Sequence, residues 1–290
     1  MDIFLQLVAN GVVLGGMYAL IAVGLTLIFG VVRVINFAHG ELLMVGMYTV
    51  YLITAATGLH PYLTALPVMG LLFVVGLTIQ WLIIQPLLNA KHEIQIFATV
   101  GLSTALINLA LLVFGADLQA APAAFARSRT QLGEVSLVNG HLLMLAVAVV
   151  VIVGLHVFLH HSRFGRAIRA TAQHREAAAL MGIDVHRVYR VTFGIGAACV
   201  GLAAALMMGL YPVFPTVGTY FVLTAFVVTV LGGMGSLFGA LIGAMIIGLV
   251  DSLSGYYIAP DLKEVVYFVL FLAILLVRPT GLFGLGRGSE

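Results

Sequence analysis

Residues 191–250, VTFGIGAACVGLAAALMMGLYPVFPTVGTYFVLTAFVVTVLGGMGSLFGALIGAMIIGLV, contain no Asp, Glu, Lys or Arg. A helix needs about 20 predominantly apolar residues to cross the hydrocarbon core of a membrane, and it satisfies its own backbone hydrogen bonds there. The stretch is therefore long enough for two or three crossings. We expect breaks at its two clusters of helix-interrupting residues, 211–215 and 232–236.

The composition of the whole chain follows the same pattern. Of 290 residues, 62% are hydrophobic and only 8% are charged, and the mean hydropathy is +1.16. About a quarter of the residues are charged in a typical soluble domain. Thirteen basic and 11 acidic side chains cannot cover a soluble surface of this size. The composition thus excludes a soluble enzyme, a nucleic-acid-binding domain and a disordered scaffold, and it indicates a polytopic membrane protein.

Charge-free stretches of the same kind place the remaining spans. They are residues 3–32, 94–116 and 135–162 with one crossing each, 42–90 with two crossings separated near 58–61, and 265–277 with the last. The sequence therefore predicts an all-α, polytopic transmembrane bundle of eight or nine spans with short broken segments. We expect it to form a single transmembrane domain over residues 1–290.

Glycine is frequent in these spans, with 33 residues in the chain. Small residues four apart let the backbones of membrane helices approach closely. The series Gly11–Gly15 and Gly235–Gly239–Gly243 have this spacing. We therefore expect both series to lie at tight helix–helix contacts.

The distribution of arginine predicts the orientation. The loop 163–190 contains six of the thirteen basic residues, opposed only by Glu176 and Asp184. Loops rich in Lys and Arg stay on the cytoplasmic side, so this loop is predicted to be cytoplasmic. Counting spans back places Arg33 and Lys91 on the same side, and the N-terminus and the segment 127–129 outside. The terminal arginines also favour the inside, which favours nine spans over eight.

The same loop predicts a short helix over residues 165–182. Ala and Arg favour helix, Gly182 stands where a helix would end, and Asp184 can cap the helix that follows. A helix of such small side chains is slim enough to enter a groove on another protein. The alternative is a basic helix that rests on anionic lipid, but such a helix would need bulkier apolar residues.

Motifs for catalysis are missing from the chain. A nucleotide-binding P-loop needs Gly-Lys followed by Ser or Thr, whereas Lys91 follows Ala90 and Lys263 follows Leu262. We find no pattern of catalytic residues and no metal-ligand spacing. The sequence therefore predicts a protein that is not an enzyme and that holds no cofactor or metal, and any ATP would be bound by partner subunits.

Five segments resemble one known family. The loop contains REAAALMGID at 175–184, with the Glu-Ala-Ala-x3-Gly pattern of ABC-importer permeases. The others are GLTLIFG at 24–30, RVINFAHGE at 33–41, LGGMGS at 231–236 and RPTGLFG at 278–284. Together the five segments extend over nearly the whole chain, and they occur in the order expected for the family. The chain therefore resembles the permease subunits of branched-chain amino-acid importers.

The resemblance implies a multi-pass permease of the bacterial inner membrane that forms the pathway for branched-chain or other apolar amino acids. It implies four partner subunits besides membrane lipid: a second homologous permease, two cytoplasmic ATP-binding subunits and an external substrate-binding protein. No nucleic acid is expected. Within the loop, the coupling residues facing the ATPase would be Arg166, Arg169, Arg175, Glu176, Ala177, Ala178, Met181 and Gly182.

Two further groups are candidates for the pathway or for a hinge. Polar groups at membrane depth are functional candidates, and helix breaks there need protein or a water-filled cavity around them. The candidates are Asn36, Phe37, His39 and Glu41 in the first group, and Gly232, Gly233, Gly235 and Ser236 in the second. For the first group, the alternative is a hydrated turn between two helices at the cytoplasmic surface.

Two other functions remain open from the sequence. One is an importer permease for urea, short amides or another small polar solute. The other is a self-contained secondary transporter or channel. Dependence of transport on a separate ATPase would distinguish the importer from the self-contained protein.

The predicted orientation can be tested with introduced thiols. Cysteine at Gln173 or Ala177, in a Cys199→Ser background, should resist an impermeant thiol reagent in intact cells, because loop 163–190 is predicted to be cytoplasmic. Ser128→Cys should react as the external control. Labelling of the loop in intact cells would reverse the orientation.

Overall fold

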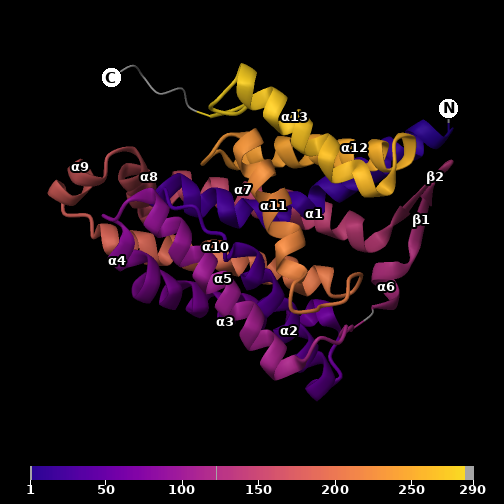
Figure 1. Cartoon of the computed structure of the whole chain (residues 1–290), viewed down its shortest axis with the longest axis horizontal. Coiled ribbons are helices and arrows are strands. Elements are labelled where there is room, and N and C mark those ends of the chain that lie inside the picture. The colour runs from indigo at the N-terminus through magenta and orange to yellow at the C-terminus, as the bar shows by residue number, and fades with distance from the viewer. Residues whose placement is uncertain (1, 122, 285–290) are drawn as a thin grey trace.

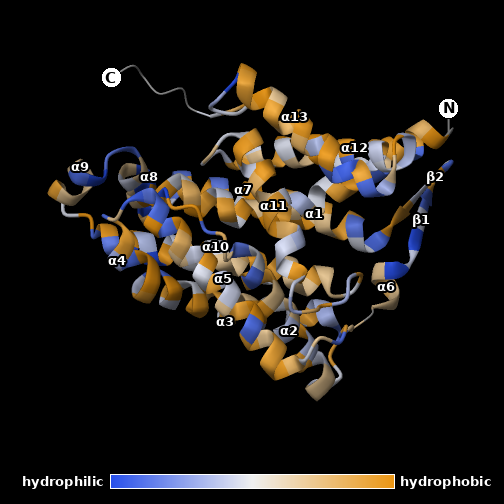
Figure 2. Cartoon of the chain, in the orientation of Figure 1, coloured by the Kyte–Doolittle hydropathy of each residue, from blue (hydrophilic) through white to orange (hydrophobic). Residues whose placement is uncertain are grey.

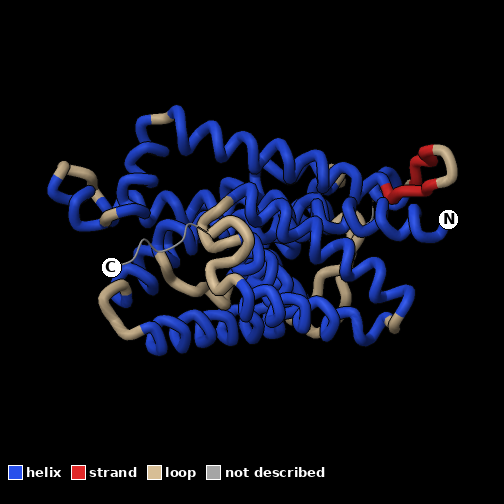
Figure 3. Tube along the Cα trace, turned by 90° about the horizontal axis from the view of Figure 1, so that it is seen from above, coloured by secondary structure: helices blue, strands red, loops and turns tan. Residues whose placement is uncertain are grey.

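The computed structural model describes residues 2–121 and 123–284, and helices make up most of it. The helices of the first half are α1 (Asp2–Val32), α2 (His39–Thr57), α3 (Ala65–Ile79), α4 (Gln85–Leu87), α5 (His92–Phe114) and α6 (Ala124–Arg127). Those of the second half are α7 (Asn139–His161), α8 (Arg163–Gln173), α9 (Arg175–Leu180), α10 (Val185–Met207), α11 (Val217–Gly232), α12 (Leu237–Tyr257) and α13 (Lys263–Val277). The long helices run roughly along one axis and form a bundle (Figures 1 and 3).

Seven helical stretches in the described residues are long and apolar enough to cross a membrane. They are Ile3–Val32, His39–Thr57, Pro61–Leu87, His92–Phe114, Asn139–His161, Val185–Met207 and Leu237–Tyr257. Two more helices are shorter, α11 with 16 residues and α13 with 15. The all-α polytopic fold is confirmed, whereas the total of eight or nine spans stays a prediction.

The predicted helix breaks are confirmed. Gly58 ends α2 with a left-handed φ of 69°, and the chain turns there into a short 3-10 helix at Pro61–Thr64. The prolines of 211–215 separate α10 from α11, and the glycines of 232–236 separate α11 from α12. Residues 191–250 thus form parts of three helices, because Pro and Gly interrupt the backbone pattern that the apolar residues favour.

The centre of the bundle is formed by α1 and α10. Most of each helix is buried, whereas few residues of α5 and α7 are buried. Helix α1 packs against α7, α10, α11 and α12, and α10 packs against α2 and α3. These two helices therefore contact most of the other long helices, whereas α5 packs on α2 and α13 packs on α11 and α12.

Glycines bring α1 and α12 into backbone contact. A Cβ added to Gly11 would lie 2.7 Å from Cα of Leu249, and one added to Gly15 would lie 2.8 Å from the carbonyl oxygen of Ala244. The series Gly235–Gly239–Gly243 makes comparable contacts with Gly30, Gly232 and Val228. The predicted packing role of both series is confirmed, and van der Waals contact of this kind drives helix association in lipid.

The two ends of the bundle are different. One end contains α8 and α9, and the other contains α6 and an antiparallel hairpin of β1 (Arg129–Leu132) and β2 (Val135–Val138) (Figure 1). Hydrophilic residues gather at both ends, and hydrophobic residues cover most of the length between them (Figure 2). The hairpin was not expected, because its strands have only four residues each and Gly133, at φ 64°, supplies its tight turn.

Side chains at the α8–α9 end place several chain segments on one side. Arg33, just after α1, donates from Nη2 to the carbonyl oxygen of Ala172 at 3.0 Å. Arg175 donates from Nη2 to Oδ1 of Asn89 at 3.1 Å. The segments around residues 33 and 89 therefore lie at the same end as loop 163–190, as the count of spans required.

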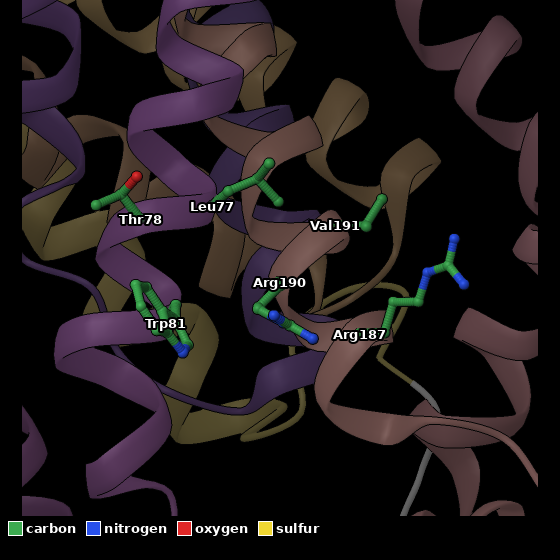
Figure 4. A pocket seen from close by; sticks show the side chains of 6 residues that line it. All are labelled: Leu77, Thr78, Trp81, Arg187, Arg190 and Val191. Carbon is green, nitrogen blue, oxygen red and sulfur yellow. The ribbon is translucent and has the colours of Figure 1, made fainter.

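A shallow hollow lies at this end of the bundle. It has a volume of about 340 Å³, with Leu77, Thr78 and Trp81 on one side and Arg187, Arg190 and Val191 of α10 on the other (Figure 4). Trp81 belongs to a π-helical turn, Gln80–Ile84, that continues α3. Tryptophan and cytoplasmic arginine are typical of the membrane–water interface.

The glycine contact between α1 and α12 leads to a stability prediction. Gly15→Leu should destabilise the folded bundle by about 2 kcal/mol or more, because its side chain would have to occupy the position of the α12 backbone. The measurement is the fraction of inserted protein that stays monodisperse on heating in detergent.

Gly70→Leu is the matched control, since nothing lies within 4 Å of a Cβ added to that glycine of α3. Equal stability of the two variants would show that the α1–α12 contact does not need a glycine.

Candidate functional site

The predicted helix over 165–182 is in fact two helices. Helix α8 ends at Gln173, His174 is extended at φ −141° and ψ 97°, and α9 begins at Arg175. The prediction of one helix was wrong. Ala and Arg favour a helix over the whole segment, but contacts with distant residues break the helix at His174. Arg33 holds Ala172, and Arg175 is bound to Asn89, so the chain turns between these two points.

The end of α9 is as predicted. Gly182 has a left-handed φ of 80°. Its amide donates to the carbonyl oxygen of Ala179 at 3.0 Å, and the amide of Ile183 donates to that of Ala178 at 3.1 Å. This pair of bonds is the Schellman motif, in which glycine is favoured because a Cβ would strain the left-handed residue. Asp184 then caps α10 by accepting from the amide of Arg187 at 2.9 Å.

Two arginines of α8 form hydrogen bonds with the end of α7. Arg169 donates from Nε to the carbonyl oxygen of Leu159 at 3.0 Å, and Arg166 donates from Nη1 to that of His161 at 3.3 Å. Ile168 and Thr171 are buried beneath α8. These side chains hold the helix against the bundle, and the coupling role of Arg166 and Arg169 stays a prediction.

Helix α9 extends away from the bundle and has an exposed apolar tip. Leu180 is 89% exposed and Met181 is 83% exposed, while Ala178 is buried beneath them. Glu176 is exposed, and within the described residues it forms neither a hydrogen bond nor an ion pair. We name the exposed residues of this tip the α9 surface: Arg175, Glu176, Ala177, Ala179, Leu180, Met181 and Gly182. Large apolar side chains exposed beyond the membrane surface are typical of a protein interaction site.

The first group of pathway candidates lies inside the bundle. Nε2 of His39 is 3.1 Å from the carbonyl oxygen of Ile21, which lies roughly 16 Å along α1 from its end at Val32. Asn36, His39 and Glu41 are all nearly fully buried, whereas Arg33 is exposed. The segment 33–38 therefore turns back into the bundle, and the alternative of a hydrated surface turn applies only to Arg33.

Several polar atoms of this group have no hydrogen-bond partner in the described part of the chain. They are Nδ2 of Asn36, Nδ1 of His39 and Oε2 of Glu41. The other carboxylate oxygen of Glu41 accepts only a long bond, 3.5 Å, from the hydroxyl of Thr219 on α11. Buried polar atoms without partners are costly, which makes Glu41 a group that could bind a ligand or move when the helices move.

The second group of candidates joins three segments at the α8–α9 end. Gly233, at φ 100°, lies against the turn that follows α13, where Leu282 donates to Leu231 at 2.8 Å and Phe283 donates to Gly232 at 3.1 Å. Ser236 caps α12 by accepting from the amide of Gly239 at 3.1 Å. These residues pack near Gly30 and the first group packs near Ile21, so the structure does not bring the two groups together.

A third site was not predicted from the sequence. A cavity of about 340 Å³ is enclosed by α1, α11, α12, α13 and the segment between α10 and α11. In it, Tyr18 donates its hydroxyl hydrogen to Oδ2 of Asp251 at 2.6 Å, and Nζ of Lys263 is 3.2 Å from Oδ1. The signal in the sequence was Asp251, an acid directly after 60 uncharged residues, but Tyr18 and Lys263 are too distant along the chain to be linked to it.

Across residues 2–121 and 123–284, no group of three or more His, Cys, Asp or Glu side chains is arranged to hold a metal ion.

Comparison with known proteins identifies relatives over nearly the whole chain. The family described as "Branched-chain amino acid transport system / permease component" matches residues 7–275. The high-affinity branched-chain amino acid transport system permease protein LivH of Escherichia coli (strain K12) is 36% identical over 97% of this chain and 96% of its own. The corresponding BraD of Pseudomonas aeruginosa is 33% identical over the same shares.

A more distant relative is the probable branched-chain amino acid transport permease protein LivH of Methanocaldococcus jannaschii. It is 29% identical over 96% of this chain and 92% of its own length. No solved structure matches the chain.

The contacts of Gly233 predict that it tolerates no large side chain. Gly233→Leu should give an inserted protein whose transport is at least roughly tenfold slower, because a left-handed residue costs about 1–2 kcal/mol and the side chain overlaps the backbone of Phe283 and Gly284. Inserted protein and ATP-driven uptake are measured in the same vesicles.

Gly154→Leu on α7 is the control, because a Cβ there has no neighbour within 4 Å. Normal uptake by Gly233→Leu would show that this close approach has no role in transport.

Proposed function

Because the chain belongs to the family of permease components of branched-chain amino-acid transport systems, we propose that it forms the translocation pathway for branched-chain or other apolar amino acids. It is a permease subunit of an ABC importer and a multi-pass protein of the inner membrane, and it works with other components of such an importer. The match over residues 7–275 is the observation that carries the function. A self-contained transporter or channel has no support from these relatives.

The partners that we propose are a second homologous permease, two cytoplasmic ATP-binding subunits and an external substrate-binding protein. The chain has no Gly-Lys-Ser/Thr sequence, which supports a division of labour in which the partners bind and hydrolyse ATP. The chain itself then needs no cofactor.

We assign the contact with the ATP-binding subunits to the α9 surface. Its apolar tip, Leu180 and Met181, is exposed, and the exposed Glu176 can pair with a basic group of the partner. Small residues at 177–179 let the helix enter a groove. The left-handed Gly182 then turns the chain sharply back into α10.

Movement of α9 would be passed on through the hydrogen bonds at its base. Arg175 joins α9 to Asn89 after α4, Arg33 joins α8 to the end of α1, and Arg169 joins α8 to the end of α7. A partner shifts a conformational equilibrium only by its differential affinity for the two states. Closure of the two ATP-binding subunits can therefore reorient α1 and α7 only if these subunits bind α9 with different affinity in the open and closed states.

The coupling role is tested with Gly182→Arg and Glu176→Lys in the assembled importer. Gly182→Arg places a side chain on a left-handed residue, and Glu176→Lys reverses the charge of the α9 surface. Each should reduce co-purification of the ATP-binding subunit or lower substrate-stimulated ATP hydrolysis in proteoliposomes by about tenfold, which corresponds to 1.4 kcal/mol.

The hairpin at the opposite end offers matched controls. Gly133 is also left-handed, at φ 64° with free space around it, and Glu134 is exposed beside it. Gly133→Arg and Glu134→Lys should leave association with the ATP-binding subunit unchanged. If Gly182→Arg and Glu176→Lys behave like these controls, the α9 surface is not the coupling site.

The solute is identified by competition. Uptake of labelled leucine by the complete importer should be reduced by excess isoleucine or valine and not by urea or short amides. If only urea or short amides compete, the substrate class is small polar solutes and not apolar amino acids.

A further inference from the structure

The unpredicted cavity is lined by charged and by apolar side chains, and the hydroxyls of Thr224 and Tyr267, 3.1 Å apart, join the two sets. Its volume of about 340 Å³ lies in the range of small-molecule sites, roughly 300–1,000 Å³. One side has the polar groups Tyr18, Asp251, Lys263 and Tyr267. The other is formed by the segment that leads into α11 and by α11 itself. We name this cavity, together with the residues that line it, the Asp251 cavity.

A buried carboxylate with unused hydrogen-bond capacity lies on the polar side. Asp251 is only 5% exposed. Its Oδ2 accepts the bond from Tyr18, but Oδ1 has no aligned hydrogen bond among the described residues, although Nζ of Lys263 is 3.2 Å away. The side chain of Lys263 is 41% exposed, so the ammonium group can move toward a ligand. Glu264, also exposed, lies at the rim.

The apolar side consists mainly of aromatic rings. Tyr211 packs edge to face with Phe221, with ring centroids 6.1 Å apart, and Phe214 packs in the same way with Tyr220 at 5.9 Å. Val217 completes this side. Aromatic and branched side chains of this kind bind an aliphatic group and disfavour a charged one, because a charged group would lose its hydration there.

The cavity lies toward the end opposite the α9 surface. Helix α12 begins beside Gly232 at the α8–α9 end, and Asp251 is about 21 Å along it from Leu237. Lys263 begins α13 directly after the turn that closes the opposite end. With loop 163–190 in the cytoplasm, the Asp251 cavity is in the outer half of the membrane, where a substrate from outside arrives first.

We infer that the Asp251 cavity binds an apolar α-amino acid as its zwitterion on the way through the permease. The ammonium group of the ligand pairs with Oδ1 of Asp251, its carboxylate pairs with Nζ of Lys263, and its side chain lies among the aromatic rings of 211–221. This inference rests on the proposed function and adds a binding site within the pathway.

A zwitterion fits the cavity better than an ion of one sign, because Asp251 and Lys263 can each exchange the other for a charged group of the ligand. In the free cavity, Asp251 and Lys263 neutralise each other. A simple amine would occupy Asp251 and leave Lys263 without a partner, and a simple carboxylate would do the reverse. A zwitterion replaces one ion pair by two, so that no charge in the cavity is left unpaired.

The test measures protection of a thiol inside the cavity. Leu14 lines the cavity and is partly exposed, so Leu14→Cys in a Cys199→Ser background supplies the thiol in the assembled importer. With L-leucine at twice its dissociation constant, reaction with a small thiol reagent should slow about threefold. Isoamylamine, which lacks the carboxylate, and isocaproate, which lacks the ammonium group, should not protect. Thr130→Cys on the exposed hairpin controls for the reagent.

A double substitution separates ligand binding from a purely structural ion pair. Asp251→Asn with Lys263→Met leaves no unpaired charge, so the bundle should assemble with its partners, whereas either single variant leaves one charge without its partner. If the pair binds the zwitterion, the double variant assembles but loses both protection by leucine and leucine uptake. Asp261→Asn, an exposed acid outside the cavity, should keep both.

Three results would overturn the inference. Leucine uptake by the parent complex without protection of Leu14→Cys would place the substrate elsewhere and leave the proposed function intact. Equal protection by isoamylamine would make the cavity an amine site. Normal uptake and protection in the double variant would show that the Asp251–Lys263 pair is a structural contact and does not bind the ligand. By contrast, a parent complex that takes up no leucine would contradict the proposed function itself.

Discussion

Every backbone polar group that lies in the membrane has to find its partner within the protein, and the structure depends on this constraint. It explains why the long apolar stretches are helices and why interruptions inside the bundle are covered by other segments. The turn at Gly233 receives hydrogen bonds from Leu282 and Phe283, and the start of α2 is held against α1 through His39. Where glycines allow backbones to touch, as between α1 and α12, the helices pack without large side chains between them.

Local residue chemistry was sufficient to predict much of the fold and part of the site. Proline and glycine marked the breaks at 58–61, 211–215 and 232–236 because their effect on a helix does not depend on distant residues. The same holds for Gly182 and Asp184, whose roles at helix ends are satisfied within a few residues. The identity of the family followed from motifs that are contiguous in the sequence.

Features that depend on distant contacts could not be predicted. The break at His174 follows from bonds that reach Arg33 and Asn89, and the burial of His39 follows from its contact with α1. The Asp251 cavity is the strongest case, because residues from four helices meet in it. A single sequence gives no measure of which of its residues are close in space.

Helix α1 connects the two proposed sites. Its end at Arg33 holds α8, while Tyr18, in the middle of the helix, bonds to Asp251 in the cavity. An element that contacts both sites can transmit a change between them when it has two arrangements that each site favours differently. In this account, closure of the ATP-binding subunits moves α8 and α9, α1 moves with them, and the Asp251 cavity changes its access to the outside.

The most direct test of this coupling is the thiol reactivity of Leu14→Cys in two nucleotide states of the assembled importer. Trapping the complex with a non-hydrolysable ATP analogue should change the reaction rate several-fold, and Gly182→Arg should abolish the change. An equal rate in both nucleotide states would contradict a connection between the α9 surface and the Asp251 cavity.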